Sequence, residues 1–289
     1  MVKSTIEKLL LDGNNIIKKR DFNNPSLDVQ LILSHLLQKD KVYLFLHREE
    51  EVDEAVEEKF YEMVKRRNAG YPLQYMINSQ EFMGLDFYVQ EGVLVPRPDT
   101  EILVEKIIKI VNETDLKSKK IKILDVGTGS GAIALSLAYY LKNAKVTAID
   151  ISEEALKTAE INKKRLNLSN IIIVNADIFK NESVFDEKYD IVVSNPPYIE
   201  RSSIKDLPVE VSRFEPKLAL DGGDDGLEYY RQIVKVFKNL NLNEGILCVE
   251  IGSNQGETVT KIFENADIFE KIECDKDYSC NDRVVTGFL

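Results

Sequence analysis

The sequence predicts an α/β protein in which a small bundle of helices precedes a parallel, doubly wound sheet. Apolar residues recur at helical spacing up to about residue 70, whereas apolar strands alternate with helices from residue 121 onwards. A glycine-rich loop lies between the first of these strands and the helix after it, which is typical of doubly wound sheets. The length of 289 residues also suits two domains.

Residues 1–75 are expected to form the helical bundle. Pro25 begins one amphipathic helix, and Gly70 to Pro72 end another. Their apolar faces comprise Val29, Leu33, Leu36 and Leu37 in the first helix and Val52, Val56, Phe60, Met63 and Val64 in the second. The basic run at residues 65–67 is interpreted as a solvated helix end. No pattern here indicates chemistry, so we expect a helical surface suited to holding a protein partner.

Residues 76–98 are expected to link the domains as a β-hairpin. Apolar segments alternate with turn residues at Phe82, Gly84-Leu85, Phe87–Val89 and Val93–Val95. Pro96 and Pro98 then break the run. Asp99 or Thr100 is predicted to cap the following helix, whose apolar residues are Leu103, Val104, Ile107, Ile108 and Val111.

Residues 99–289 are predicted to form the sheet with its covering helices. The predicted strands are 121–126, 146–149, 171–174, 191–194, 246–251 and a last strand at 284–289. The predicted helices are 132–141, one capped by Ser152, 227–237 and 258–264.

Composition and charge exclude several classes of function. No apolar run approaches the ~18 residues of a membrane span, and no apolar leader follows Met1, so a cytoplasmic location without membrane contact is expected. The net charge of -11 disfavours direct nucleic acid binding. With two histidines and no C-x-x-C pair among three cysteines, neither a metal site nor a histidine-dependent triad is expected.

The strongest local signal is the loop at residues 125–131, which follows the first strand and opens a helix. Its glycines permit a tight turn and let a ligand touch the backbone. About 20 residues further on, Asp150 ends the second strand, where a carboxylate can accept both hydroxyls of an adenosine ribose. The loop residues expected to bind a cofactor are Gly127, Thr128, Gly129, Ser130 and Gly131.

Two cofactors fit this loop. The G-x-G-x-x-A spacing from Gly127 also satisfies the dinucleotide fingerprint, so NAD competes. Asp125 favours S-adenosylmethionine, because a carboxylate at the loop entry would repel a pyrophosphate but attract an amino group. After the third strand, Asp177 and Ile178 are expected to meet the adenine, Asp177 by accepting from its amine and Ile178 by packing on its ring. A turn-capping role for Asp177 is nearly as well supported.

The predicted catalytic segment directly follows strand 191–194 and comprises Asn195, Pro196, Pro197 and Tyr198. Loops at this end of an open α/β sheet face the ligand crevice, and the two prolines stiffen the backbone. The Asn195 side-chain oxygen and the Pro196 carbonyl can accept the two hydrogens of a planar NH2 group, while Tyr198 stacks on its plane. We therefore expect methyl transfer to a planar nitrogen, with Asn195 lying against the cofactor.

These residues resemble those of a known family. Asn-Pro-Pro-Tyr is the signature of methyltransferases that act on amino groups of adenine, guanine or glutamine. The flanks are similar to the HemK/PrmC family over nearly the whole chain, at residues 66–75, 81–87, 93–101, 214–220, 222–227 and 250–256. The end departs in one respect, because no glycine precedes the segment Asp282 to Val284.

The resemblance implies a Rossmann-like class I S-adenosylmethionine methyltransferase with a seven-stranded, mostly parallel sheet at residues 99–289. It implies S-adenosylmethionine as cofactor, S-adenosylhomocysteine as product, and the glutamine of the Gly-Gly-Gln motif in peptide chain release factors as substrate. The bundle at 1–75 and the hairpin at 76–98 would help to hold the release factor. A monomer is expected.

Other functions compete with this one. Within the class they are methylation of a glutamine in a ribosomal protein and methylation of amino groups on DNA or rRNA bases. The segment Arg97 to Glu101 counts against the ribosomal-protein enzymes, and the acidic charge counts against the nucleic-acid enzymes. An NAD-dependent oxidoreductase, or a protein that only binds a partner, would belong to a different class.

Overall fold

The computed structural model describes residues 4–19, 23–180, 187–240 and 244–289. The chain divides into two compact units, Met1–Ser79 with Pro208–Phe214 and Gln80–Leu207 with Glu215–Leu289. This division departs from the predicted boundaries at residues 75 and 98, because the hairpin packs with the second unit and a distant segment joins the first. Residues 1–3 and 20–22 of the predicted first domain lie outside the described residues.

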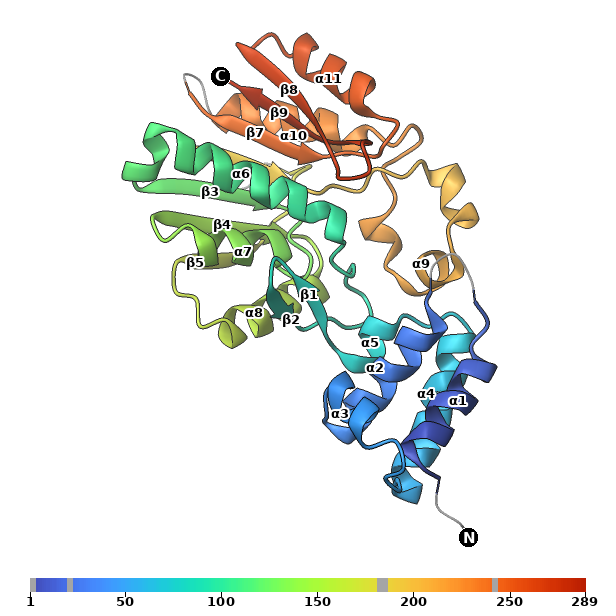
Figure 1. The fold of residues 1–289 in the computed structure, drawn as a ribbon. Coiled ribbons are helices and arrows are strands. Elements are labelled where there is room, and N and C mark those ends of the chain that lie inside the picture. The colour runs from blue at the N-terminus through green and yellow to red at the C-terminus, as the bar shows by residue number, and fades with distance from the viewer. Residues whose placement is uncertain (1–3, 20–22, 181–186, 241–243) are drawn as a thin grey trace. The chain divides into compact units, whose positions relative to one another are not determined.

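The first unit is a helical bundle (Figure 1). Its helices are α1 (Ile6–Ile16), α2 (Pro25–Leu37), α3 (Lys41–Leu46), α4 (Glu54–Asn68), α5 (Leu73–Ile77) and α9 (Val209–Phe214). Asn24 caps α2 by accepting from the Leu27 N–H, and Pro25 occupies the first turn, where no N–H is needed. The predicted apolar faces form the core, in which Leu33 and Phe60 are fully buried.

One prediction for the bundle is wrong in part. Residues 65–67 form the last turn of α4, and Lys65 and Arg66 are exposed as predicted, but Arg67 is buried at 3% exposure. Its Nε donates to Asp28 Oδ2 at 2.6 Å and its Nη1 to Glu210 Oε2 at 2.6 Å. A buried guanidinium needs such partners, because an unpaired charge in the interior is very costly. Arg67 therefore connects α4 with α2 and α9.

The second unit contains a seven-stranded sheet in the order β5-β4-β3-β6-β7-β9-β8 (Figure 1). Its strands are β3 (Ile121–Val126), β4 (Ala144–Asp150), β5 (Ile171–Asn175), β6 (Ile191–Ser194), β7 (Ile246–Glu250), β8 (Lys271–Lys276) and β9 (Asp282–Phe288). The first five pair in parallel, whereas β9 pairs antiparallel with β7 and β8. The seven-stranded, mostly parallel sheet is thus confirmed, and so is the hairpin of β1 (Gln80–Phe82) and β2 (Leu85–Phe87).

Helices cover both faces of the sheet, as the doubly wound prediction requires. They are α6 (Glu101–Glu113), α7 (Ala132–Tyr140), α8 (Glu153–Arg165), α10 (Glu228–Leu240) and α11 (Gly256–Asn265). Side chains alternate along each strand, so Ile191 and Val193 join the core with α6 and α7, while Val192 joins the core with α10 and α11. Ser152 caps α8 by accepting from the Ala155 N–H, as predicted.

The strand order reverses beside β3, whose neighbours are β4 on one side and β6 on the other. In such a sheet the loops beyond the carboxyl ends of these strands diverge and leave a crevice. The register places Val126 beside Ser194, and the Ser194 hydroxyl donates to the Val126 carbonyl at 2.7 Å. This bond fixes the starting points of the glycine loop and of the Asn-Pro-Pro-Tyr segment relative to each other. No helix within the described ranges has the length and apolar character that a bilayer span requires.

Candidate active site

A cavity of about 280 Å³ opens at this switch point in the second unit. Its wall includes nearly all the residues predicted to bind cofactor or substrate: Gly127, Thr128, Gly129, Ser130, Asp150, Asp177, Ile178, Asn195, Pro196 and Pro197. Small-molecule sites typically occupy about 300–1,000 Å³, so the cavity is close to the lower end of the range for a bound ligand. Residues of segments 92–100 and 216–219 also line it.

The glycine loop owes its path to three left-handed residues. Gly127, Gly129 and Gly131 have φ values of +74°, +57° and +85°. A side chain at such angles clashes with its own carbonyl, so glycine is the residue that fits. Gly131 carries a second constraint, because a Cβ there would lie 2.7 Å from Leu135 Cδ1. Gly131 itself is not part of the cavity wall and serves to bring the loop close to α7.

Asp125 does not contact the cavity as expected. Its side chain is fully buried and accepts from the Thr128 hydroxyl at 2.6 Å. Burial raises the pKa of the Asp125 carboxyl to about 7, although the bond from Thr128 lowers it. Asp125 therefore acts on the shape of the loop through Thr128. The sequence argument that it meets the ligand's amino group directly is not supported.

Asp150 lies at the end of β4 on the cavity wall. Its Oδ2 accepts from the Gly129 N–H at 2.8 Å, and its Oδ1 accepts from the Ser152 N–H at 2.9 Å. Each carboxylate oxygen can accept a second hydrogen bond, so both remain able to meet a ligand's hydroxyls. Burial raises the pKa of Asp150, and the bonds from Ser152 and Gly129 oppose this rise.

The far part of the wall is apolar and aromatic. Ile178 is buried against α10, where the Gln232 amide donates to the Ile178 carbonyl at 2.6 Å. Phe179 and Tyr229 meet edge to face, with ring centroids 5.3 Å apart. Asp177 accepts from the Phe179 N–H at 2.9 Å, so it caps a turn, the competing role that the sequence left open. Sequence reasoning missed both aromatic residues because neither stands in a recognisable motif.

Asn195 is held from a distant part of the chain. Its Nδ2 donates to Thr100 Oγ1 at 3.1 Å, across 95 residues of sequence. Thr100 occupies the N-cap position of α6 but makes no capping bond with its side chain, contrary to prediction. Thr100 is buried at 4% exposure, and its hydroxyl oxygen accepts from Asn195 of the Asn-Pro-Pro-Tyr segment instead. The motif containing Thr100 was visible in the sequence, but this contact was not.

Tyr198 takes a different position from the rest of its motif. It is not among the residues that line the cavity, and it packs against the core beneath α10 and α11. The Tyr198 carbonyl accepts from the Gln255 amide at 3.0 Å. Burial raises the pKa of Tyr198 to about 12, helped by the nearby Glu250 carboxyl. In this conformation the ring supports the loop and does not stack on a group in the cavity.

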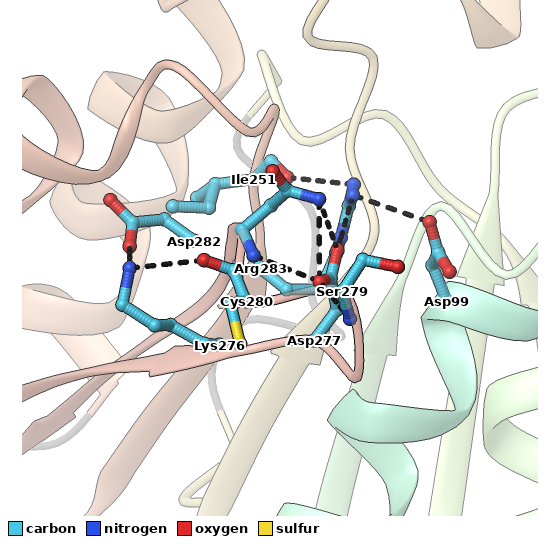
Figure 2. Close-up of polar contacts among 9 residues, drawn as sticks. Asp99, Ile251, Lys276, Asp277, Ser279, Cys280, Asp282 and Arg283 are labelled. Atoms are coloured by element: carbon cyan, nitrogen blue, oxygen red, sulfur yellow. Dashed lines mark hydrogen bonds and ion pairs between the residues drawn. The ribbon is translucent and has the colours of Figure 1, made fainter.

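Two ion-paired arginines border the site. Arg97 lines the cavity, and its Nη2 donates to both carboxylate oxygens of Glu215, at 2.8 and 2.7 Å. Behind the site, Arg283 is paired with Asp277 at 2.9 Å and Asp99 at 3.2 Å, as Figure 2 shows. Sequence reasoning recognised both segments as family motifs but gave these side chains no role.

The comparisons with known proteins agree with this geometry. Residues 8–77 match the PrmC N-terminal domain family, and residues 117–280 match a methyltransferase domain family. The release factor glutamine methyltransferase of Clostridium acetobutylicum is 40% identical over 97% of this chain and 97% of its own length. The protein of that name from Fusobacterium nucleatum is 40% identical over 93% of this chain and 75% of its own length.

A solved structure supports the fold of the second unit. It is assigned as a SAM-dependent methyltransferase from Streptococcus mutans and superposes with a TM-score of 0.50 at 13% identity, covering 73% of this chain and 55% of that chain. The extent of the sequence similarity goes further than the fold, because it spans the helical bundle, the glycine loop and the Asn-Pro-Pro-Tyr segment together. The chain therefore belongs to the release factor glutamine methyltransferase family and is an S-adenosylmethionine-dependent methyltransferase.

Proposed function

We propose that this protein methylates the side-chain amide nitrogen of the glutamine in the Gly-Gly-Gln motif of peptide chain release factors. The observation that carries the proposal is the orientation of Asn195 on the cavity wall. Its Nδ2 is used by Thr100, which leaves Oδ1 to accept from a planar amino group. The names of the two relatives, which specify glutamine and release factors, support the choice of substrate.

The cavity wall fits S-adenosylmethionine. The open backbone at Gly127 and Gly129, where a Cβ would meet nothing within 4 Å, leaves room for a ligand to approach the loop. Asp150 has acceptor capacity for the ribose hydroxyls, and Ile178 offers an apolar surface for the adenine. We propose that Thr128, Ser130, Asp177 and Asn195 complete the contacts. When bound, S-adenosylmethionine supplies an electrophilic methyl group on sulfur.

The protein's own task is to orient and polarise a weak nucleophile. An amide nitrogen shares its lone pair with the carbonyl, so it attacks poorly unless its N–H bonds are polarised. We propose that Asn195 Oδ1 and the Pro196 carbonyl accept the two hydrogens, while Pro196 and Pro197 keep the loop stiff. Fixing the reacting geometry can contribute about 7–11 kcal/mol to lowering a barrier, and acceptors that are already in place add to it.

The nitrogen must also lose a proton after it gains the methyl group. Tyr198 is unsuited to accept this proton at neutral pH, because its ionised form is disfavoured by a pKa of about 12. Asn195 has no basic group. We propose that water accepts the proton as the methylated amide leaves.

The helical bundle is proposed to hold the release factor. Residues 8–77 match the N-terminal domain of the family, and α3 leaves Val42, Phe45 and Leu46 more than 60% exposed. Exposed apolar side chains gathered on one short helix are typical of protein-binding surfaces. The hairpin at residues 80–87 is proposed to take part, and the protein is proposed to act as a monomer.

The test is a methylation assay with labelled S-adenosylmethionine and a purified release factor. Mass spectrometry of the labelled peptide is expected to place one methyl group on the glutamine of Gly-Gly-Gln. A release factor with that glutamine changed to alanine is the control and should remain unlabelled. Label on another residue, or on a ribosomal protein or rRNA but not on the release factor, would refute the proposal.

A further inference from the structure

A buried carboxyl group that the proposed reaction does not use lies directly behind the catalytic segment. Glu250 ends β7 and is 1% exposed. β7 pairs with β6, the strand that leads into Asn195. Glu250 is not among the residues that line the cavity, so it does not touch a ligand there. Burying an acidic side chain costs free energy unless neighbouring groups form hydrogen bonds or ion pairs with it.

Those neighbours are the two residues that set the geometry of the site. The side chains of Thr100 and Asn195 both act as hydrogen-bond donors that lower the pKa of Glu250, opposing the burial that raises it to about 7. The Asn195 Nδ2 in turn donates to Thr100 Oγ1 at 3.1 Å. Glu250 Oε2 makes no hydrogen bond of standard geometry within the described part of the chain, and Thr100 and Asn195 are the side chains whose hydrogen bonding lowers the pKa of Glu250.

The donor and the acceptor of each hydrogen bond in this arrangement follow from the chemistry of the three side chains. An ionised carboxylate only accepts, so the single hydroxyl hydrogen of Thr100 points to Glu250. The Thr100 oxygen is then left to accept, and among the two ends of the Asn195 amide only Nδ2 can donate to it. A flipped Asn195 amide would turn its oxygen toward two acceptors. The carboxylate thereby excludes the flipped state.

We propose that Glu250 is a positioning residue for methyl transfer, which acts through Thr100 to keep the Asn195 amide oxygen turned toward the substrate. This inference rests on the proposed function, because it assigns Asn195 Oδ1 the task of accepting from the substrate amide. A flipped Asn195 would present its own NH2 group to the substrate NH2 group, and two donors repel.

The charged groups around Glu250 act on its ionisation in opposite directions. Arg283 favours the ionised carboxylate, and Asp99 opposes it. Figure 2 shows how Arg283 is fixed: it is paired with Asp99 and Asp277, and its Nη1 donates to the carbonyl of Ile251, the residue after Glu250. The hydroxyl groups of Tyr198 and Tyr230 lie close enough to feel the same charge and remain neutral, because burial raises the pKa of both.

The principal test is Glu250→Gln, which keeps the shape of the side chain but adds a donor. Its NH2 group can donate to Thr100, and Thr100 can then donate to the Asn195 oxygen, so the flipped amide becomes acceptable. We expect kcat to fall by about tenfold, the factor that one lost hydrogen bond represents. The KM for the release factor and the affinity for S-adenosylhomocysteine should stay within about twofold, because neither contact involves Glu250. Glu257→Gln, an exposed carboxyl on α11, is the matched control with unchanged kcat.

A pH profile separates positioning from a merely structural role. In the wild type, kcat should decline as pH falls through about 7, because a protonated Glu250 can donate and no longer dictates the direction of the Thr100 hydroxyl. Glu250→Gln should lack this decline over the same range, since glutamine does not titrate. A decline of equal size in the variant would overturn the proposal.

A second pair of variants tests the relay independently of how well Glu250→Gln folds. Thr100→Ser keeps the hydroxyl and should retain most of the wild-type kcat, whereas Thr100→Val removes it and should lose about tenfold. Wild-type kcat in Thr100→Val or in Glu250→Gln would refute the relay. If the wild type proves to methylate a substrate other than a release factor, the proposed function fails, but the same variants measured on that substrate still decide the role of Glu250.

Discussion

The active site depends on single side chains whose partners are far away in sequence. Asn195 was predicted from its motif, and its place on the cavity wall agrees with that prediction. Its partner Thr100 was one of two residues, with Asp99, predicted to cap the next helix, because both residue types are common before an amphipathic helix. Nothing in the local sequence reveals that β6 and the start of α6 meet.

Asn195→Ala is expected to abolish most methyl transfer while lowering cofactor affinity only slightly, because the glycine loop, Asp150 and Ile178 supply most of the proposed cofactor contacts. The change removes the proposed acceptor for one amide hydrogen and leaves that hydrogen unpaired, at about 1–3 kcal/mol, in addition to lost orientation. Turnover with a release factor and calorimetric binding of S-adenosylhomocysteine measure the two effects. Near-normal kcat in Asn195→Ala would contradict the proposed mechanism.

Asp125→Asn is expected to stabilise the protein at neutral and alkaline pH. The folded state holds a proton on Asp125 up to about pH 7, whereas the carboxyl has an ordinary pKa of 3.8. Wild-type stability therefore declines as pH rises between these values. The asparagine does not titrate, so the variant should gain about 1–2 kcal/mol near pH 8, below the ~4 kcal/mol of a three-unit shift.

Urea unfolding of both proteins near pH 4 and pH 8 measures this effect. The two curves should differ little at the acid end, because pH 4 is close to the ordinary pKa of 3.8 and most of the loss of wild-type stability occurs between there and pH 7. Glu250 also has a pKa of about 7, but it is present in both proteins and cancels in the difference. If the difference in free energy of unfolding between the two proteins does not grow with pH, burial does not raise the pKa of Asp125.

Elements were more predictable than contacts. Strands β3 and β6 have the predicted bounds, because β6 is buried along its whole length and β3 is buried everywhere except at Lys122. β8 was not assigned a residue range, because lysine and acidic residues alternate with its apolar ones and it lies at the sheet edge. Without the resemblance to a family, which implies seven strands, the edge strand β8 would have been missed.

The local backbone conformation was also only partly predictable from the sequence. The departure noted before Asp282 falls in a turn where Cys280 has φ +64°. Glycine adopts this conformation freely, and cysteine does so at a cost. The Asp277 carboxylate offsets the cost by accepting from the N–H groups of Ser279 and Asn281, at 2.9 Å each. The sequence indicated an irregular turn but not what holds it.

Gly131→Ala is expected to weaken cofactor binding and to destabilise the second unit. The left-handed backbone costs about 1–2 kcal/mol for a residue with a Cβ, and contact with Leu135 adds to it. Gly84→Ala is the matched control: it has φ +68°, but its Cβ would come no closer than 3.8 Å to another group. Thermal unfolding and S-adenosylhomocysteine binding of both variants separate strain from crowding. Equal losses in both would show that crowding at Gly131 is unimportant.

At the scale of the whole molecule, the division into units does not follow the order of the sequence. Pro208–Phe214 belongs to the helical unit although about 130 residues of the second unit precede it. A helix of six residues has little local signal, and its place depends on partners such as Arg67. Apolar periodicity could not predict the position of this helix, because that position depends on the buried ion pair with Arg67.

Arg67→Ala is expected to destabilise the helical unit by about 3–5 kcal/mol, since it leaves two acidic side chains without their shared partner. Arg66→Ala is the control, because Arg66 only covers the Tyr71 ring at 4.1 Å and should cost less than about 1 kcal/mol. Urea unfolding measures both.

The cofactor cavity is built wholly from the second unit, so S-adenosylhomocysteine affinity should persist in Arg67→Ala while the KM for the release factor rises. If cofactor affinity fell as much as release factor affinity, the two units could not be assigned these separate tasks.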